Sequence, residues 1–310
     1  MPPLPNRVYL LGSPNLTSEP KVNMEVSKQL SRRRFLGRSA KYLSLAAAGT
    51  FLYTWRIEPH WVEVTNQSLP IEGLPAEMIG KRLVQVSDLH AGPIVDQQFL
   101  ISSLEGIAEL KPDAIVMTGD FMTCYGGESV GQALDVIRAM PSAPLGKLAI
   151  LGNHDYGEGW VQERVANKLC DGLTRLGVRP LRNEVAELGG LQVAGVDDLW
   201  AGSRFQPERA LRELASDRPA LALCHNPDGV DRPEWEGYRG WILAGHTHGG
   251  QCKPPFLPPP LTPVKNKRYI AGTYDVGAGR SLYINRGLGY LRRVRFNARP
   301  EITVFTLQQA

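Results

Sequence analysis

The chain has few cysteines, and none of them has the spacing of a metal or redox motif. The four cysteines among 310 residues are scattered as Cys124, Cys170, Cys224 and Cys252. No two form a CxxC pair, which excludes a zinc knuckle and a thioredoxin-like site. Four buried free thiols are the simpler interpretation of this scatter, and one or two disulfides stay open.

Charge of one sign is also scarce. Lys and Arg number 35 against 31 Asp and Glu, a net charge of +4. The basic excess collects in short clusters, "SRRRFLGR" at 31–38 and "YLRRVRF" at 290–296. A continuous basic surface is not indicated, so we expect no specific nucleic-acid partner. A metal-dependent nuclease would need a basic groove, for which 292–295 is the only candidate cluster.

No hydrophobic run reaches the length of a comfortable membrane span. The apolar stretch 42–55 has about 14 residues, whereas a span needs about 20. It follows the basic cluster 31–38, and a basic head before an apolar run is the layout of an export signal. The head resembles the twin-arginine motif in its order of Ser31, Arg32, Arg33, Phe35, Leu36 and Arg38.

This N-terminal pattern predicts export through the twin-arginine translocase, to the periplasm or the outer face of the cytoplasmic membrane. No clean A-x-A cleavage site follows the run, so a retained anchor with peripheral membrane association is the alternative. We expect three parts: a leader at 1–30, with Met24 as an alternative start, the signal or anchor at 31–56, and one folded domain at 57–310.

Beyond residue 57, short apolar runs alternate with helix-like segments. We expect helices at 96–113, 128–140 and 159–176, and strands at 82–88, 114–120, 146–155, 191–198, 219–225, 240–246, 269–275, 280–287 and 301–307. Alternation followed by a run of strands predicts an α/β sandwich. The proline-rich loop (residues 253–263) is either a lip over a site or a stiff crossover.

Five of the six histidines follow predicted strands, together with acidic and amide residues. The clusters are "SDLH" with Asp88 and His90, "GD" with Asp120, "GNHD" with Asn153 and His154, "CHNPD" with His225, and "GHTH" with His246 and His248. Carboxyl ends of strands are where open α/β sheets place their sites. In extended chain, residues two apart point the same way, so each D-x-H or H-x-H pair could aim into one pocket.

The ligand types define the pocket. Carboxylate, imidazole and amide oxygen suit manganese, iron or zinc. Seven such ligands are too many for one tetrahedral ion, whereas two ions about 3.5–4 Å apart, bridged by a carboxylate, would use them all. The sequence therefore predicts a centre of two divalent metal ions that binds a phosphoryl group.

The ordered motifs "SDLHAG…GDF…GNHDY…CHNPD…AGHTHGGQ" resemble those of the calcineurin-like metallophosphoesterases, over nearly all of 82–307. The tail from Tyr269 onward is similar to the twin-arginine-exported bacterial branch. This resemblance implies a four-layer α/β/β/α sandwich with two mixed β-sheets. It also implies an exported enzyme that hydrolyses a phosphomonoester, a phosphodiester or a pyrophosphate bond, the last as in UDP-2,3-diacylglucosamine.

The resemblance also implies a role for each motif residue. One ion would take Asp88, His90, His248 and the bridging Asp120, and the other would take Asp120, Asn153, His225 and His246. His154 would act as a general acid or stabilise phosphoryl charge. Asp155 would hold His154 in orientation. Scaffold members of the fold tend to lose the His154 position, so its presence argues against a non-catalytic scaffold.

Weaker candidates lie outside these motifs. Arg286 could contact a phosphate, or it could form a salt bridge. Asp197 and Asp198 could support the ligands or cap a turn. Gly245, Gly249 and Gly250 would let the backbone turn tightly beside the metals. The sequence points to a small phosphorylated or lipid-linked substrate without identifying it.

Overall fold

The computed structural model describes residues 31–123 and 129–310, so the leader, the alternative start Met24 and Cys124 lie outside the described residues. The described chain divides into two units, with the boundary between Ala47 and Ala48. Helix α1 (Arg32–Leu52) begins in the basic head and has no buried residue. Among the described helices, none combines the length and the apolar character needed to cross a bilayer. Cys170, Cys224 and Cys252 are free thiols, but only Cys224 is buried as predicted, and Cys170 and Cys252 are partly exposed.

Residues 48–310 fold around two six-stranded sheets, each mixing parallel and antiparallel pairs. The first sheet has the order β1 (Glu63–Ile71), β12 (Glu301–Gln309), β2 (Arg82–Val86), β3 (Ala114–Thr118), β4 (Gly146–Ile150) and β5 (Arg179–Pro180). The second has the order β10 (Gly272–Asp275), β11 (Arg280–Ile284), β9 (Gly240–Ala244), β8 (Ala220–Leu223), β7 (Leu191–Gly195) and β6 (Glu184–Leu188).

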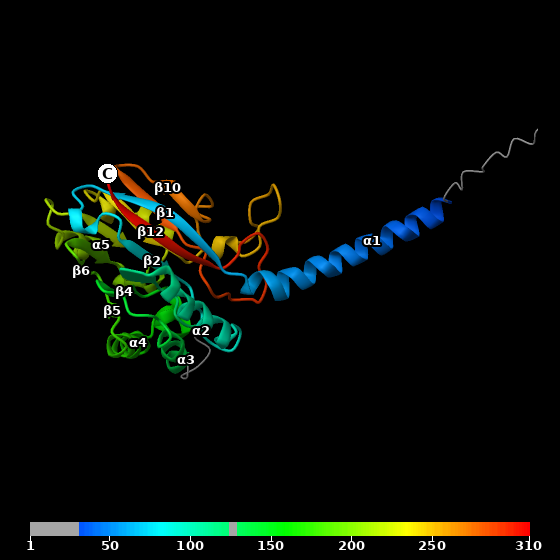
Figure 1. The fold of residues 1–310 in the computed structure, drawn as a ribbon, viewed down its shortest axis with the longest axis horizontal. Helices are drawn as coiled ribbons and strands as arrows, with labels where there is room; N and C mark the ends of the chain where they lie inside the picture. The colour runs from blue at the N-terminus through cyan, green and yellow to red at the C-terminus, as the bar shows by residue number, and fades with distance from the viewer. Residues whose placement is uncertain (1–30, 124–128) are drawn as a thin grey trace, which may run out of the picture. The chain divides into compact units, whose positions relative to one another are not determined.

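Helices cover the outer faces of the two sheets, which confirms the predicted four-layer α/β/β/α sandwich. The helices α2 (Gln97–Glu105), α3 (Ser129–Ile137) and α4 (Glu163–Arg175) gather on one side of the molecule in Figure 1. Their apolar side chains pack with those of β2 and β3 in one core cluster. Short α5 (Pro207–Arg212) lies on the second sheet, where Ala210 packs with Ala194 and Ala222.

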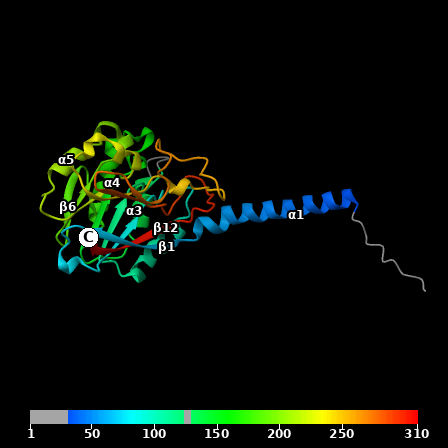
Figure 2. The ribbon, with the colours of Figure 1, turned by 90° about the horizontal axis from the view of Figure 1, so that it is seen from above.

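The central core lies between the sheets. Leu83, Val116 and Ile150 of the first sheet join Leu221 and Leu243 of the second in one cluster. Strands β3 and β7 are buried at every residue, as expected of apolar strands covered on both faces. In Figure 2, β1 and β12 run side by side, because β1 pairs in parallel with the last strand of the chain.

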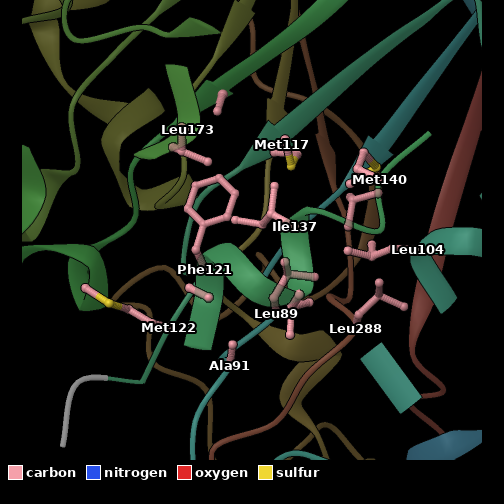
Figure 3. Packing of buried hydrophobic residues seen from close by; sticks show 14 of the residues in the cluster. Leu89, Ala91, Leu104, Met117, Phe121, Met122, Ile137, Met140, Leu173 and Leu288 are labelled. Carbon is pink, nitrogen blue, oxygen red and sulfur yellow. The ribbon is translucent and has the colours of Figure 1, made fainter. Parts of the chain in front are cut away.

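The cluster formed by β2, β3 and the helices α2, α3 and α4 anchors the loops that carry the polar motifs. Leu89, between Asp88 and His90, and Phe121, after Asp120, are buried in this cluster. Phe121 points toward Leu173 of α4 and Ile137 of α3 in Figure 3. The apolar residues of these motifs therefore hold the loops to the helices, while their polar neighbours remain available to the site.

The predicted elements from residue 82 onward are present, most with shorter bounds, whereas the strand predicted at 301–307 extends to Gln309 as β12. The helix expected at 96–113 is α2, continued by the short helix Gly106–Leu110, and Asp96 caps it by accepting from the Phe99 amide. Four elements were not foreseen: β1, β5, β6 and α5. Strands β1, β5 and β6 are edge strands, and α5 has only 6 residues, so each has too few buried positions for a clear sequence period.

Candidate metal centre

The predicted ligands come together where loops leave the carboxyl ends of strands from both sheets. All seven side chains are buried: Asp88 and His90 after β2, Asp120 after β3, Asn153 after β4, His225 after β8, and His246 and His248 after β9. Gln85 of β2 joins the two sheets beneath them, donating to the Thr118 hydroxyl (3.0 Å) and the Ala244 carbonyl (2.9 Å).

One cluster contains Asp88, His90 and His248. Oδ1 of Asp88 lies 3.4 Å from Nε2 of His248 and 4.0 Å from Nε2 of His90. The two Nε2 atoms are 3.0 Å apart. Three potential ligand atoms from two loops, the one after β2 and the one after β9, thus converge on one point.

A second cluster contains Asp120, His225 and His246. Oδ2 of Asp120 lies 3.3 Å from Nε2 of His225, which in turn lies 3.2 Å from Nδ1 of His246. The same Oδ2 is 3.5 Å from Nε2 of His90 in the first cluster. Asp120 therefore stands between the two clusters, where a bridging carboxylate would have to be.

Hydrogen bonds on the far side of each ring set which nitrogen faces the site. Nδ1 of His225 contacts the Thr118 carbonyl at 2.6 Å, and Nδ1 of His90 contacts the Thr123 hydroxyl at 3.0 Å. His246 is reversed, because its Nε2 lies 3.3 Å from the Pro263 carbonyl. A carbonyl can only accept, so these contacts leave Nε2 of His225 and Nδ1 of His246 as the ligand atoms.

Buried polar atoms without partners show that the cluster fits a metal. In the described part of the chain, neither Oδ1 nor Nδ2 of Asn153 has a hydrogen-bond partner, and Nδ1 of His248 has none either. A buried polar atom left unpaired costs roughly 1–3 kcal/mol. An ion bound by the amide oxygen of Asn153 would remove part of that cost. Carboxylate, imidazole and amide oxygen together match manganese, iron or zinc.

The electrostatics of the site centre on Asp120 and His225. Burial acts to raise the pKa of Asp120, but His225, His154 and His90 outweigh it and hold that pKa well below its usual value. Burial acts to lower the pKa of His225, and Asp120 reverses this and raises it well above normal. Burial lowers the pKa of His90 and of His246 to about 3. A metal would compete with the proton that these shifts favour on His225.

The backbone aims these side chains differently from our expectation. Asp88, His90, Asp120, His246 and His248 all have positive φ, between 48° and 71°. The D-x-H and H-x-H pairs are thus not extended chain: both members of each pair adopt the left-handed conformation. Asp and His tolerate this region better than most residues, and strain of this kind gathers at functional sites.

Gly245 and its neighbours allow the tight fit that the sequence suggested. A Cβ on Gly245 would overlap the Ser87 hydroxyl and the Asp88 carboxylate. Gly249 and Gly250 have φ of 62° and 74°, which favours glycine in the turn after His248.

Comparisons with known proteins agree with this geometry. The family model for calcineurin-like phosphoesterases matches residues 81–250. The chain belongs to the calcineurin-like phosphoesterase family. It is 35% identical over 291 residues to the uncharacterized metallophosphoesterase YkuE of Bacillus subtilis, across 91% of this chain and 99% of that protein.

Two further relatives of this phosphoesterase have a stated activity. Phosphodiesterase YaeI of Escherichia coli is 32% identical over 286 residues, which cover 90% of this chain and 99% of that protein. The UDP-2,3-diacylglucosamine pyrophosphatase LpxG of Chlamydia trachomatis is 27% identical over 322 residues, which cover 86% and 96%. The chain is therefore a hydrolase that acts on phosphate ester bonds.

In this phosphoesterase, His154 lies at the mouth of the buried cluster. Its side chain groups with His90 and Asp120, its ring centroid is 5.0 Å from that of His90, and it is half-buried. The backbone amide of His154 donates to Oδ1 of Asp120 at 3.0 Å. The residue is thus held against the cluster while part of it stays open to solvent.

Asp155 does not have the orienting contact that we expected. Its carboxylate accepts from the backbone amides of Phe121 and Gly152, both at 2.9 Å, and of Met122 at 3.4 Å, instead of from the His154 ring. Because of burial and the nearby Asp120, the pKa of Asp155 is raised well above normal. Asp155 therefore ties the loop after β4 to the loop after β3.

Arg286 is engaged by two carboxylates. Its Nε donates to Glu301 at 3.0 Å and its Nη2 to Glu63 at 2.8 Å. Of the two interpretations left open by the sequence, the ion pair is the one present. Asp198 caps a turn, accepting from the Trp200 amide at 2.7 Å, and Asp197 pairs with Arg182.

Two residues at the mouth were missed by the sequence argument. Trp160 and Trp200 stack on each other, and their rings approach His154 and His246. They lie in loops 40 positions apart and carry no motif. Their placement after β4 and β7, beside motif residues at other strand ends, is the only signal that could have found them.

Proposed function

We propose that this phosphoesterase hydrolyses a phosphomonoester, phosphodiester or pyrophosphate bond at a centre of two divalent metal ions. The carrying observation is the position of Asp120, 3.5 Å from His90 and 3.3 Å from His225, between two ligand clusters. The ions would polarise the phosphoryl oxygens and activate water for attack. One ion would be held by Asp88, His90 and His248. The other would be held by Asn153, His225 and His246, and Asp120 would bind both ions.

His154 would serve the leaving group. It contacts the cluster through Asp120 and is more open to solvent than the buried ligands. From this position its ring could donate a proton to the departing oxygen, or stabilise the charge that develops on the phosphoryl group.

A phosphodiester is the first candidate substrate, supported by the similarity to phosphodiesterase YaeI. A nucleotide-linked lipid of the UDP-2,3-diacylglucosamine type is the second, supported by the similarity to LpxG and by the proline-rich loop. That loop exposes Phe256, Leu257 and Leu261, while its Pro263 carbonyl lies against His246. An apolar tip next to the site suits a substrate held in a lipid surface.

The test uses full-length protein freed of metal and reloaded with Mn²⁺, Fe²⁺ or Zn²⁺ in turn. It is assayed on p-nitrophenyl phosphate, bis(p-nitrophenyl) phosphate and UDP-2,3-diacylglucosamine. We expect hydrolysis of at least one substrate to disappear on chelation and to return with metal. Undiminished activity in protein that elemental analysis finds free of metal would refute the metal centre.

We also infer that the chain is exported by the twin-arginine translocase and works in the periplasm or on the outer face of the cytoplasmic membrane. Arg32 and Arg33 open α1, whose apolar residues Leu43 and Leu45 are exposed. Replacing both arginines by lysine should trap the protein in the cytoplasm, because the receptor reads the arginine pair. A double variant that still reaches the envelope would refute this route.

A further inference from the structure

Trp160 and Trp200 form an aromatic wall beside the metal-binding cluster. Their ring centroids are 4.8 Å apart with an interplanar angle of 25°. Trp200 meets His246 edge to face at 4.5 Å, and Trp160 approaches His154 at 6.1 Å. The pair thus reaches from a predicted metal ligand to the predicted acid, and both indoles keep part of their surface exposed.

Ion pairs join the two loops that present the tryptophans. Glu163 begins α4, three positions after Trp160, and it accepts from Arg204 and from Arg182, the latter at 2.6 Å. Arg204 ends the short helix Leu199–Arg204, which contains Trp200. Glu163 therefore links one loop to the other. These ion pairs therefore fix the two tryptophan-bearing loops relative to each other.

The backbone supports the same view. Trp160 has a φ of 61°, a conformation that bulky residues rarely adopt. The amide of Trp200 is fixed by the buried carboxylate of Asp198 at 2.7 Å. This pair is held with part of each indole exposed, next to the place where the ester would bind.

We propose that the wall formed by Trp160 and Trp200 is a substrate subsite for a planar aromatic ring carried by the phosphate ester. Indole surfaces attract flat π-systems by offset stacking or edge-to-face contact. A phosphate at the Asp120 centre would place its next substituent beside His154 and His246, which the wall adjoins. The subsite rests on the proposed function, since that centre has to bind the phosphate. A nucleobase and a simple aryl group share this chemistry.

The binding test compares three ligands that cannot be hydrolysed. Methylphosphonate, phenylphosphonate and the phosphonate analogue of uridine monophosphate are titrated calorimetrically into the full-length protein reloaded with Mn²⁺. The ring-bearing ligands should bind tighter than methylphosphonate by about 5- to 150-fold, the range of one base–aromatic stack. Trp160→Leu and Trp200→Leu should each reduce this preference. Trp61→Leu, an exposed tryptophan elsewhere, should leave it unchanged.

The pattern of preference identifies the ring. Tighter binding of the uridine analogue alone supports a nucleotide, whereas tighter binding of both ring-bearing ligands supports any aryl ester. Equal affinity of all three ligands for the unaltered protein would overturn the subsite. An equal loss of affinity for all three ligands in the tryptophan variants, with reduced Mn²⁺ content, would show that the wall only positions His154 and His246. That result would also overturn the subsite.

A kinetic comparison separates the subsite from the proposed function. Uridine 5′-S-methyl phosphorothioate and O,S-dimethyl phosphorothioate share methanethiolate as the leaving group, carry no other aromatic ring and differ in the retained substituent. Trp200→Leu should raise KM for the first ester about 5-fold or more and change kcat for either little. An equal fall in kcat for both esters would contradict the subsite. A ring preference in the calorimetry without hydrolysis of any ester would leave the subsite standing and refute the proposed function.

Discussion

Asp120 is the residue on which both ligand clusters depend. Its carboxylate lies between His90 and His225, and it holds the pKa of His225 well above normal. Asp120→Asn keeps the shape and removes the charge. We expect fewer than two metal ions per chain by elemental analysis and activity at background, because the remaining amide cannot bridge two cations. A variant that keeps two ions and full activity would exclude Asp120 as the bridge.

His154 is expected to behave in the opposite way. It lies at the mouth and is not among the predicted ligands, so His154→Asn should retain both ions. The rate should fall about 10²- to 10⁴-fold, the usual contribution of a positioned acid. The fall should be smallest for a nitrophenolate leaving group, which needs little protonation. Loss of metal from this variant would make His154 a ligand, and equal losses for good and poor leaving groups would make it a charge stabiliser.

At the scale of the element, the strand β9 and its following turn are packed against Asp88 with no space to spare. Gly245→Ala would drive a Cβ into Asp88 and Ser87. We expect loss of metal and a lower Tm. Gly131→Ala is the matched control, because nothing lies within 4 Å of the Cβ position in α3. That control should gain roughly 0.5–1 kcal/mol of helix stability. A normal metal content in Gly245→Ala would disprove the tight fit.

The proline-rich loop is the element that we expect to contact a lipid surface. Phe256, Leu257 and Leu261 are exposed, and so are Lys253 at the start of the loop and Arg292, whose carbonyl accepts from the Gln251 side chain. Apolar insertion and attraction to anionic headgroups would act together.

Lipid contact can be measured locally, which separates the loop from α1. A photoreactive benzoylphenylalanine at position 256 should crosslink to lipid in vesicles that contain anionic phosphatidylglycerol. The same group at the exposed Val161 should crosslink far less. Phe256→Ser with Leu257→Ser should weaken sedimentation with these vesicles about 10-fold or more, since each apolar side chain contributes about 1.5–3 kcal/mol when buried. Equal crosslinking at positions 256 and 161 would count against the loop.

At the scale of the whole molecule, the buried ligand cluster lowers the free energy of unfolding as long as no metal is bound. Burial raises the pKa of Asp88 to about 6 and that of Asp198 to about 7, so folding without metal disfavours their charged forms. An ion that binds only the folded chain, at 100 times its Kd, stabilises it by about 2.7 kcal/mol.

We therefore expect chelation to lower Tm, and Mn²⁺ to restore it, by roughly 5–10 °C in a scanning calorimeter. Asp120→Asn should show a much smaller response to Mn²⁺, which serves as the control. An unaltered protein whose Tm ignores both chelator and Mn²⁺ would not contain the proposed centre.

Within residues 82–307, strands buried on both faces could be predicted from their apolar runs, and helices from their capping residues. Asp96 at the start of α2 is one such case. Strand β1 was beyond prediction, because it pairs only with β12, more than 200 positions away, and its polar residues have no period without that partner. The edge strand β6 differs, because its partner β7 is the next strand in the chain, and β6 was missed because few of its five residues are buried.

The sequence by itself determined which donor atoms are present and that each follows a strand, because residue type and local apolar runs are properties of the chain alone. Only the tertiary structure decided that β2 and β3 of one sheet meet β8 and β9 of the other at one centre. It also decided that Asp155 binds backbone amides and that Trp160 stacks on Trp200. These contacts join loops far apart in sequence. They depend on strand order and on left-handed backbone at the ligands, neither of which a local pattern encodes.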